Sequence, residues 1–182
     1  MPEISLNILD IAQNAVTAGA KLITVTVAAN EKADTLTVGV TDDGCGMTPE
    51  QVERVTDPFY TTRTTRKVGL GVPFFKMAAE MTGGTFGIGS EKGIGTEVSA
   101  VFCLSHIDRM PLGDIAETMV SLIAPNPGID FVLNYHTDEG EFIMDTREFR
   151  EVLGDVRLSE PAVLSYIDTF IKDNIAACGK PL

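Results

Sequence analysis

Two short segments in which apolar residues alternate with threonine constrain the fold of this chain most strongly. Residues 21–28 alternate Ile23, Val25 and Val27 with Thr24 and Thr26, and residues 35–40 repeat the pattern. Alternation with a period of two predicts β-strands with one buried and one polar face. A doubly wound parallel sheet needs strands that are apolar on both faces, so a Rossmann domain is disfavoured. We expect an α+β fold, a two-layer sandwich with helices on one face of a mixed sheet.

Helical periodicity and turn residues predict the other elements of the first part of the chain. Apolar residues recur at helical spacing over 4–18, and 72–81 predicts a further helix. Thr48-Pro49-Glu50-Gln51 combines an N-cap residue, a first-turn proline and a capping-box glutamine, which is typical of a helix start. Two more strands are expected over 85–89 and 96–104.

The pattern changes after residue 104. Helices are predicted over 114–124, about 146–153 and about 160–177, with a β-hairpin of strands 131–135 and 141–144 between the first two. We therefore expect two units, a domain over 1–104 and a small α-β-hairpin-α extension over 105–182. The extension either completes the core or serves a partner.

The formal net charge of −12, from 26 acidic and 14 basic side chains, constrains the partners. Such an acidic chain repels phosphate backbones and anionic lipids, so we expect no nucleic-acid and no membrane binding. The sequence has no apolar run of bilayer-spanning length and no basic leader, which predicts a cytoplasmic protein. Its three separate cysteines lack a C-x-x-C pair, which favours a reducing compartment without structural zinc.

The predicted first helix carries a polar stripe. Asp10 and Asn14 are four residues apart and share one face. Such a pair on its own usually marks a solvent-exposed face. An Asn amide oxygen is also a hard neutral ligand suited to Mg²⁺, and a carboxylate one turn away can orient or deprotonate a nucleophile.

An Asp-Gly-rich turn, Asp42-Asp43-Gly44-Cys45-Gly46, follows the second predicted strand. This composition is common in simple turns. A carboxylate at a strand end can also accept a hydrogen bond from an adenine amino group, while glycines let the backbone approach the flat base. The turn is therefore a candidate base-binding site.

A loop before the second long helix concentrates positive charge. Arg63, Arg66 and Lys67 are followed by Gly69-Leu70-Gly71. Glycines that open a helix expose N–H groups at the positive end of the helix dipole, which suits a phosphate. The loop predicts an anionic ligand, although the short glycine pattern alone is weak. Gly95-Thr96, at the start of the last strand of this part, by itself predicts only a hairpin.

Together, the order and spacing of these motifs resemble the GHKL superfamily of ATP-binding domains, which includes gyrase, heat-shock chaperone ATPases, sensor histidine kinases and the mismatch-repair protein MutL. The resemblance spans residues 4–104 and implies a Bergerat-type fold that holds Mg-ATP between helices and sheet. The matching segments are a MutL-like N-box at Leu9–Ala15, the D-x-G-x-G box at Asp42–Gly46, the kinase F-box at Asp57–Arg63, and glycine boxes at Gly69–Gly71 and Gly95-Thr96.

The resemblance also implies roles for individual residues. Asn14 would bind Mg²⁺, Asp42 would accept from the adenine amino group, and Thr96 would belong to the network around Asp42. Asp10 stands where hydrolysing members have Glu and many kinases have Asn, so it is either a catalytic base or a bystander. The other implied nucleotide-binding residues are Gly44, Gly46, Arg63, Gly69, Leu70 and Gly71.

Residues 104–112 resemble the phosphoacceptor box of histidine kinases, with His106 at the acceptor position. The alternative is a histidine in a linker. We expect a magnesium-dependent kinase that phosphorylates a protein side chain in signalling. A slow ATPase, or an ATP-sensing module whose lid closure controls a partner, remains the alternative.

Two expectations concern partners. The acidic part after residue 104 is the expected binding portion for an unidentified protein. The chain begins close to the N-box, so either that part or a second subunit is expected to cover the first helix, and we expect a homodimer.

Overall fold

The computed structural model describes residues 3–57 and 70–181. The predicted elements are present, and their boundaries differ from the expected ones by at most two residues. The helices are α1 (Ile4–Thr17), α2 (Pro49–Val55), α3 (Gly71–Met81), α4 (Ile115–Ile123), α5 (Thr146–Leu153) and α6 (Pro161–Cys178). The strands are β1 (Leu22–Asn30), β2 (Thr35–Asp42), β3 (Thr85–Glu91), β4 (Gly95–Cys103), β5 (Asp130–His136) and β6 (Glu141–Asp145).

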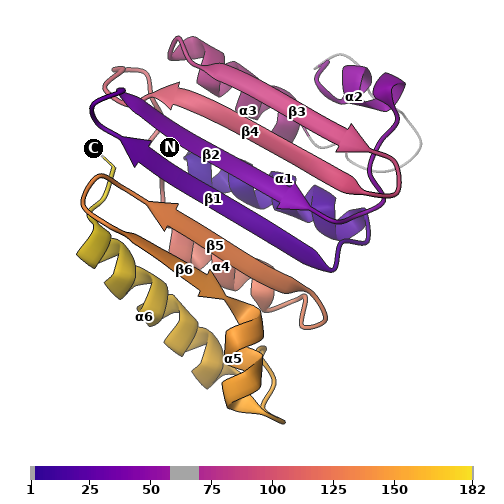
Figure 1. Ribbon diagram of the computed structural model, residues 1–182, viewed down its shortest axis with the longest axis vertical. Coiled ribbons are helices and arrows are strands. Elements are labelled where there is room, and N and C mark those ends of the chain that lie inside the picture. The colour runs from indigo at the N-terminus through magenta and orange to yellow at the C-terminus, as the bar shows by residue number, and fades with distance from the viewer. Residues whose placement is uncertain (1–2, 58–69, 182) are drawn as a thin grey trace.

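The strands form one six-stranded sheet in the order β3-β4-β2-β1-β5-β6 (Figure 1). Neighbouring strands are antiparallel except β1 and β5, which run parallel. The sheet is therefore mixed, and the predicted α+β class is confirmed. Among the described helices, none is long and apolar enough to cross a membrane.

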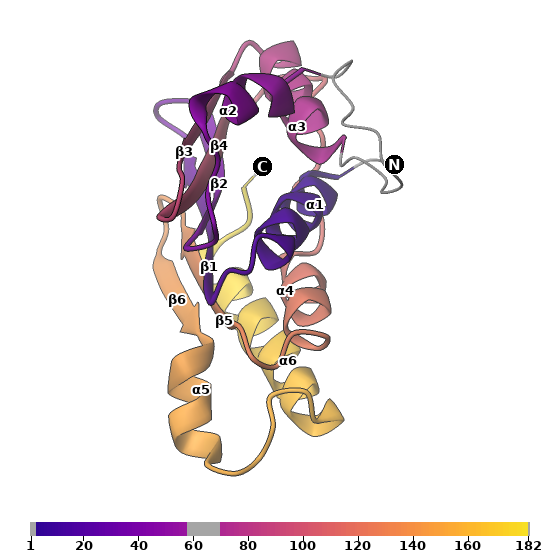
Figure 2. The same ribbon diagram turned by 90° about the vertical axis from the view of Figure 1, so that its right-hand side faces the viewer.

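The alternation in β1 and β2 separates the two faces of the sheet. Ile23, Val25 and Val27 are fully buried, whereas the threonines between them are partly exposed. Helices α1, α3 and α4 lie on the side of the buried residues (Figure 2). The opposite, threonine-rich face carries no helix in the described part of the chain, which explains why apolar side chains occur mainly at every second position.

The part after residue 104 continues the same sheet and the same core. Strand β5 pairs with β1, with Phe131 opposite Ile23, and both side chains are fully buried in one continuous hydrophobic cluster. The start of α1 is held from this side too, because the N–H groups of Ile4 and Ser5 donate to the carbonyls of Pro111 and Leu112 at 3.0 and 2.8 Å. Residues 105–182 thus complete the core. Their separate domain status stays a prediction.

Helix α2 shows how local sequence sets an element end. The hydroxyl of Thr48 accepts from the N–H of Gln51 at 3.4 Å, and the Gln51 side chain accepts from the N–H of Thr48 at 2.9 Å. This capping box, with Pro49 in the first turn, was predicted from four residues. No α2 side chain is fully buried, although Val55 packs against the core, so the cap adds to the limited packing of this helix.

Candidate functional site

A cavity of about 210 Å³ lies at one end of the sheet, beneath α1. Its polar lining comes from residues that are far apart in sequence: Asn14 of α1, Asp42 at the end of β2, Gly46 of the following loop and Thr96 of β4. Small, mostly apolar cavities with a few convergent polar groups are typical of small-molecule sites. The other lining residues are Ile11, Ala15, Ala18, Cys45, Met47, Val55, Val72, Ile88 and Val98.

Asp42 and Asp43 are neighbours with different surroundings. Asp43 accepts from the N–H groups of Lys21 and Leu22 at 2.7 and 2.9 Å, so its side chain fixes the start of β1. These backbone hydrogen bonds outweigh the effect of burial and lower the pKa of Asp43. Desolvation by burial instead raises the pKa of Asp42, although N–H donation from Gly44 opposes it. Asp42 is thus the carboxylate that faces the cavity.

The glycines of the turn are required by the protein's own packing. Gly44 is buried, and its N–H donates to Oδ1 of Asp42 at 2.8 Å, which fixes the carboxylate. A Cβ on Gly44 would approach the Ala18 Cβ to 2.9 Å. Gly46 has a φ of +63°, and a Cβ there would collide with the carbonyl of Glu91. Of the two glycines, Gly46 lines the cavity.

Thr96 belongs to a polar row that crosses three strands. Asp42 pairs with Thr96 across β2 and β4, and Thr96 pairs with Ser90 across β4 and β3. The hydroxyls of Ser90 and Thr96 are 2.8 Å apart. The next row inward, Val40, Val98 and Ile88, is apolar. Sequence reasoning missed Ser90, whose only signal was its place six residues before Thr96.

Asn14 and Asp10 lie on the exposed side of α1, and Asn14 lines the cavity. Its amide suits a Mg²⁺ ion that keeps waters and phosphate oxygens as its other ligands. The described residues contain no cluster of three or more His, Cys, Asp or Glu side chains that could hold a metal. An ion at this position would therefore depend on the nucleotide for most of its ligands.

Asp10 lies against the start of α3. A Cβ on Gly71, the first residue of that helix, would come within 2.8 Å of the Asp10 Cβ, so glycine allows α1 and α3 to pack closely. Although Asp10 is exposed overall, partial desolvation raises the pKa of its carboxyl group. Leu70 forms the N-cap of α3 and is 43% exposed. Neither Leu70 nor Gly71 lines the cavity.

Comparison with known proteins decides the family. The model of the histidine kinase-, DNA gyrase B- and HSP90-like ATPase family matches residues 3–106, more than half of the chain. The chain belongs to this family. The matched range contains every cavity-lining residue named above.

Three relatives of this ATPase-family chain are named as sensor proteins. A putative sensor protein of Shewanella frigidimarina is 31% identical over 108 residues, which is 58% of this chain and 16% of the relative. Sensor protein SrrB of Staphylococcus aureus is 35% identical over 101 residues, 53% of this chain and 17% of the relative. Heme sensor protein HssS of Staphylococcus saprophyticus is 34% identical over 95 residues, 50% and 21% respectively. The chain thus spans about a fifth of the length of these relatives.

A solved structure supports the fold. The N-terminal domain of a DNA repair protein superposes with a TM-score of 0.53 and 11% identity, over 80% of this chain and 52% of that one. At this identity the likeness concerns the fold alone. The superposition covers 80% of this chain, which is more than residues 3–106 alone. The similarity in fold therefore extends beyond the residues that the family model matches.

Three expected site residues of this ATPase-family fold are not among the described residues that line the cavity. Arg63 and Gly69 lie outside the described residues. His106 follows the far end of β4, where Cys103 pairs with Thr35. A nine-residue strand is roughly 30 Å long, so His106 lies far from Thr96 at the cavity end.

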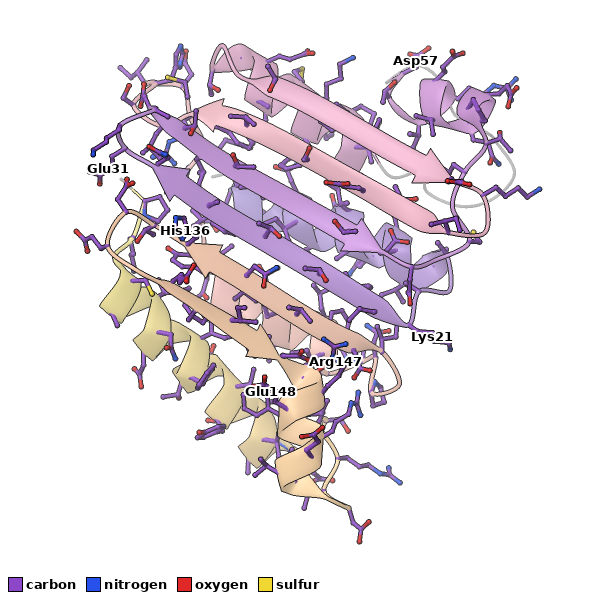
Figure 3. All side chains as sticks on the ribbon, in the orientation of Figure 1. Lys21, Glu31, Asp57, His136, Arg147 and Glu148 are labelled. Carbon is purple, nitrogen blue, oxygen red and sulfur yellow. The ribbon has the colours of Figure 1, made fainter. Side chains whose placement is uncertain are left out.

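Figure 3 shows this separation along the sheet. Lys21 and Asp57 mark the cavity end, while Glu31 and His136 mark the opposite end, to which the last residues of β4 run. His106 itself is part of a local turn, because its Nδ1 accepts from the N–H of Asp108 at 3.1 Å. A phosphoryl group bound at the cavity is therefore out of reach of the same molecule's His106 in this conformation.

Proposed function

We propose that this protein binds Mg-ATP in the cavity beneath α1 and transfers the γ-phosphoryl group to a side chain of another protein molecule. The observation that carries the proposal is the convergence of Asn14, Asp42 and Thr96 in one apolar cavity of an ATPase-family fold. The names of the three relatives described above, which are sensor proteins, support a role in signalling.

Each residue has a chemical task in the proposal. Asp42 accepts a hydrogen bond from the adenine amino group, and the apolar residues around it exclude water from the base. Asn14 supplies a neutral oxygen ligand to the metal. When bound, Mg²⁺ neutralises charge that develops on the transferred group. Backbone N–H groups at the start of α3 and the side chain of Arg63 would meet the phosphates, with Gly44, Gly46, Gly69, Leu70 and Gly71 shaping the surrounding backbone.

The acceptor side chain would come from a second molecule. The distance from the cavity to His106 favours transfer in trans, either to His106 of a second copy in a homodimer or to a different protein. We assign recognition of that partner to the acidic part after residue 104, and we place the reaction in the cytoplasm.

Incubation with ATP labelled at the γ-phosphate tests the proposal. The proposed kinase puts label on protein, a slow ATPase releases labelled inorganic phosphate, and an ATP-sensing module does neither while still being stabilised by Mg-ATP. Asn14→Ala is expected to lose the magnesium-dependent part of this stabilisation. Absence of any thermal shift with Mg-ATP would contradict the proposal as a whole.

Mixing two variants tests transfer in trans. Asn14→Ala retains His106 but is expected to lack productive Mg-ATP, and His106→Ala retains the nucleotide site but lacks the acceptor. If His106 accepts from a second molecule, the mixture labels the Asn14→Ala chain, whereas neither variant alone becomes labelled. Label on the His106→Ala chain alone would assign the acceptor to another side chain.

ATP hydrolysis is the second candidate, and Asp10 favours it. Its carboxylate shares a helix face with Asn14, and partial desolvation raises its pKa, which is the direction that suits a general base. If Asp10 activates water, Asp10→Asn should lower phosphate release by about 100-fold or more while ATP still binds. Glu80→Gln, which changes an exposed carboxylate in α3, is the matched control. Equal turnover in Asp10→Asn and in the unaltered protein would exclude the base role.

A further inference from the structure

The hydroxyl of Ser90 has three hydrogen-bonding neighbours. The N–H of Met47 donates to its Oγ at 2.8 Å, the carbonyl of Gly95 lies at 3.0 Å, and Oγ1 of Thr96 lies at 2.8 Å. Ser90 therefore connects the loop before α2, the β3–β4 turn and the polar row at the cavity. Figure 1 shows β3 and β4 side by side at this edge of the sheet.

These contacts determine where the hydroxyl protons point. A serine hydroxyl donates one hydrogen bond and accepts two. The Gly95 carbonyl can only accept, so it takes the Ser90 proton. The Met47 N–H can only donate, so it occupies one lone pair of Ser90. The remaining lone pair accepts from Thr96, and only this arrangement satisfies all three contacts.

The consequence for the cavity concerns Thr96. Its proton is directed at Ser90, so its Oγ1 offers the cavity lone pairs and no donor. The neighbouring Asp42 carboxylate, held by the N–H of Gly44, is also an acceptor when ionised. The polar end of the cavity therefore presents two acceptors side by side. A 6-aminopurine carries two donor hydrogens on its 6-amino group, one for each acceptor. A 6-oxopurine has an acceptor at its 6 position and a single donor, the N–H of the adjacent ring nitrogen, so it can satisfy only one of the two acceptors.

We propose that Ser90 is a specificity-determining residue, which positions the Thr96 hydroxyl as an acceptor and thereby makes the cavity favour a 6-aminopurine over a 6-oxopurine nucleotide. The inference rests on the proposed function, because it concerns the base of the nucleotide in the same cavity. Ser90 acts through Thr96 and has no contact with the nucleotide in this proposal.

The test compares ATP with inosine triphosphate, which differs from ATP at the 6 position and the adjacent ring nitrogen. Dissociation constants for both nucleotides with Mg²⁺ are measured on the full chain. Ser90→Ala frees the Thr96 proton to turn towards the cavity, so the preference for ATP should fall by about five- to tenfold, the effect of one net hydrogen bond. Ser90→Thr keeps the hydroxyl and should keep the preference. Ser99→Ala, on the opposite face of β4, is the matched control.

The ratio of the two constants distinguishes specificity from a structural role. Loosening of the β3–β4 turn weakens both nucleotides alike and leaves the ratio unchanged, which would overturn the inference. Thr96→Val should lower the ratio too, and adding Ser90→Ala to it should have no further effect. A further drop in the double variant would show that Ser90 acts by another route and would also overturn the inference.

The unaltered protein separates this inference from the proposed function. If it binds ATP and inosine triphosphate equally well, the base preference assigned to Ser90 and Thr96 is wrong while ATP binding stands. If it binds neither, the proposed function fails and the inference fails with it.

Discussion

At the scale of the residue, two adjacent aspartates have different surroundings and, in our proposal, different tasks. Asp43 accepts from the backbone N–H groups of Lys21 and Leu22, at the start of β1, and contributes to the fold. Asp42 is partly buried at the cavity, and its desolvation raises its pKa. A group whose pKa is raised by folding destabilises the folded state where it is ionised. The ionised Asp42 carboxylate therefore lowers the stability of the ligand-free protein. A hydrogen bond from a bound donor would offset this cost.

Asp42→Asn tests this division. The variant should melt no lower than the unaltered protein without ligand, because the neutral amide removes the desolvation cost. The pKa of Asp42 is raised above its usual value of 3.8. As the pH falls through this raised pKa, the difference in stability between the variant and the unaltered protein should vanish, because protonation neutralises the Asp42 carboxylate of the unaltered protein. At ATP concentrations of about 100 times the dissociation constant, roughly 2.7 kcal/mol of stabilisation should be lost in the variant.

The measurement is thermal unfolding at several pH values, with and without Mg-ATP. Asp43→Asn is the contrasting variant, and it should destabilise the ligand-free protein. This destabilisation should become smaller as the pH falls through the lowered pKa of Asp43, because protonation then removes the charge in the unaltered protein too. A large ATP-induced shift in Asp42→Asn would contradict the assigned role.

Gly46 is the residue at which backbone geometry limits the sequence most. Ala at this position combines a positive φ with a collision against the Glu91 carbonyl, so Gly46→Ala should cost at least about 2 kcal/mol of unfolding free energy. Gly89→Ala, where a Cβ would meet nothing within 4 Å, should cost little. Urea denaturation of both variants checks the difference, and equal losses would argue against the collision.

At the scale of the element, α2 depends on its ends more than on its burial. It buries no side chain, yet it carries a complete capping box, and its last residue, Val55, lines the cavity. An element held in this way is expected to open locally without global unfolding. Its order and the occupancy of the cavity should therefore be coupled.

Thr48→Ala tests this coupling. Loss of the cap should cost α2 about 1 kcal/mol, which should raise amide hydrogen exchange in residues 50–55 and leave global unfolding nearly unchanged. Mg-ATP should restore part of the protection through Val55. Glu53→Ala, an exposed change inside α2, serves as the control. A fall in global stability as large as the local one would show that α2 is integral to the core.

At the scale of the whole molecule, one sheet and one hydrophobic cluster join the ATPase-family part to the part after residue 104. The central strand β1 pairs with β2 on one side and with β5 on the other. The Ile23 side chain of β1 is fully buried, and removing β5 would expose it to solvent. The two parts should consequently unfold together.

Phe131→Ala tests cooperativity across this junction. The large-to-small change at a fully buried side chain should cost about 3–5 kcal/mol. Native-state hydrogen exchange should show that amides of β2 lose as much protection as those of β5. Ile143→Ala, at a side chain 63% exposed, is the control. Loss of protection confined to residues after 104 would instead support two independently folding domains.

The amino-acid sequence alone determined the elements and the family. Local periodicity, capping residues and glycines act within a few positions, so the alternation in β1 and the capping box of α2 were readable directly, and the spaced motifs indicated the nucleotide-binding fold. The tertiary structure decided which residues meet. Strand order and register set Ser90 beside Thr96, gave Asp42 and Asp43 different surroundings, and carried His106 to the far end of the sheet. Such contacts join residues from different strands, and local propensity holds no information about pairing over that distance.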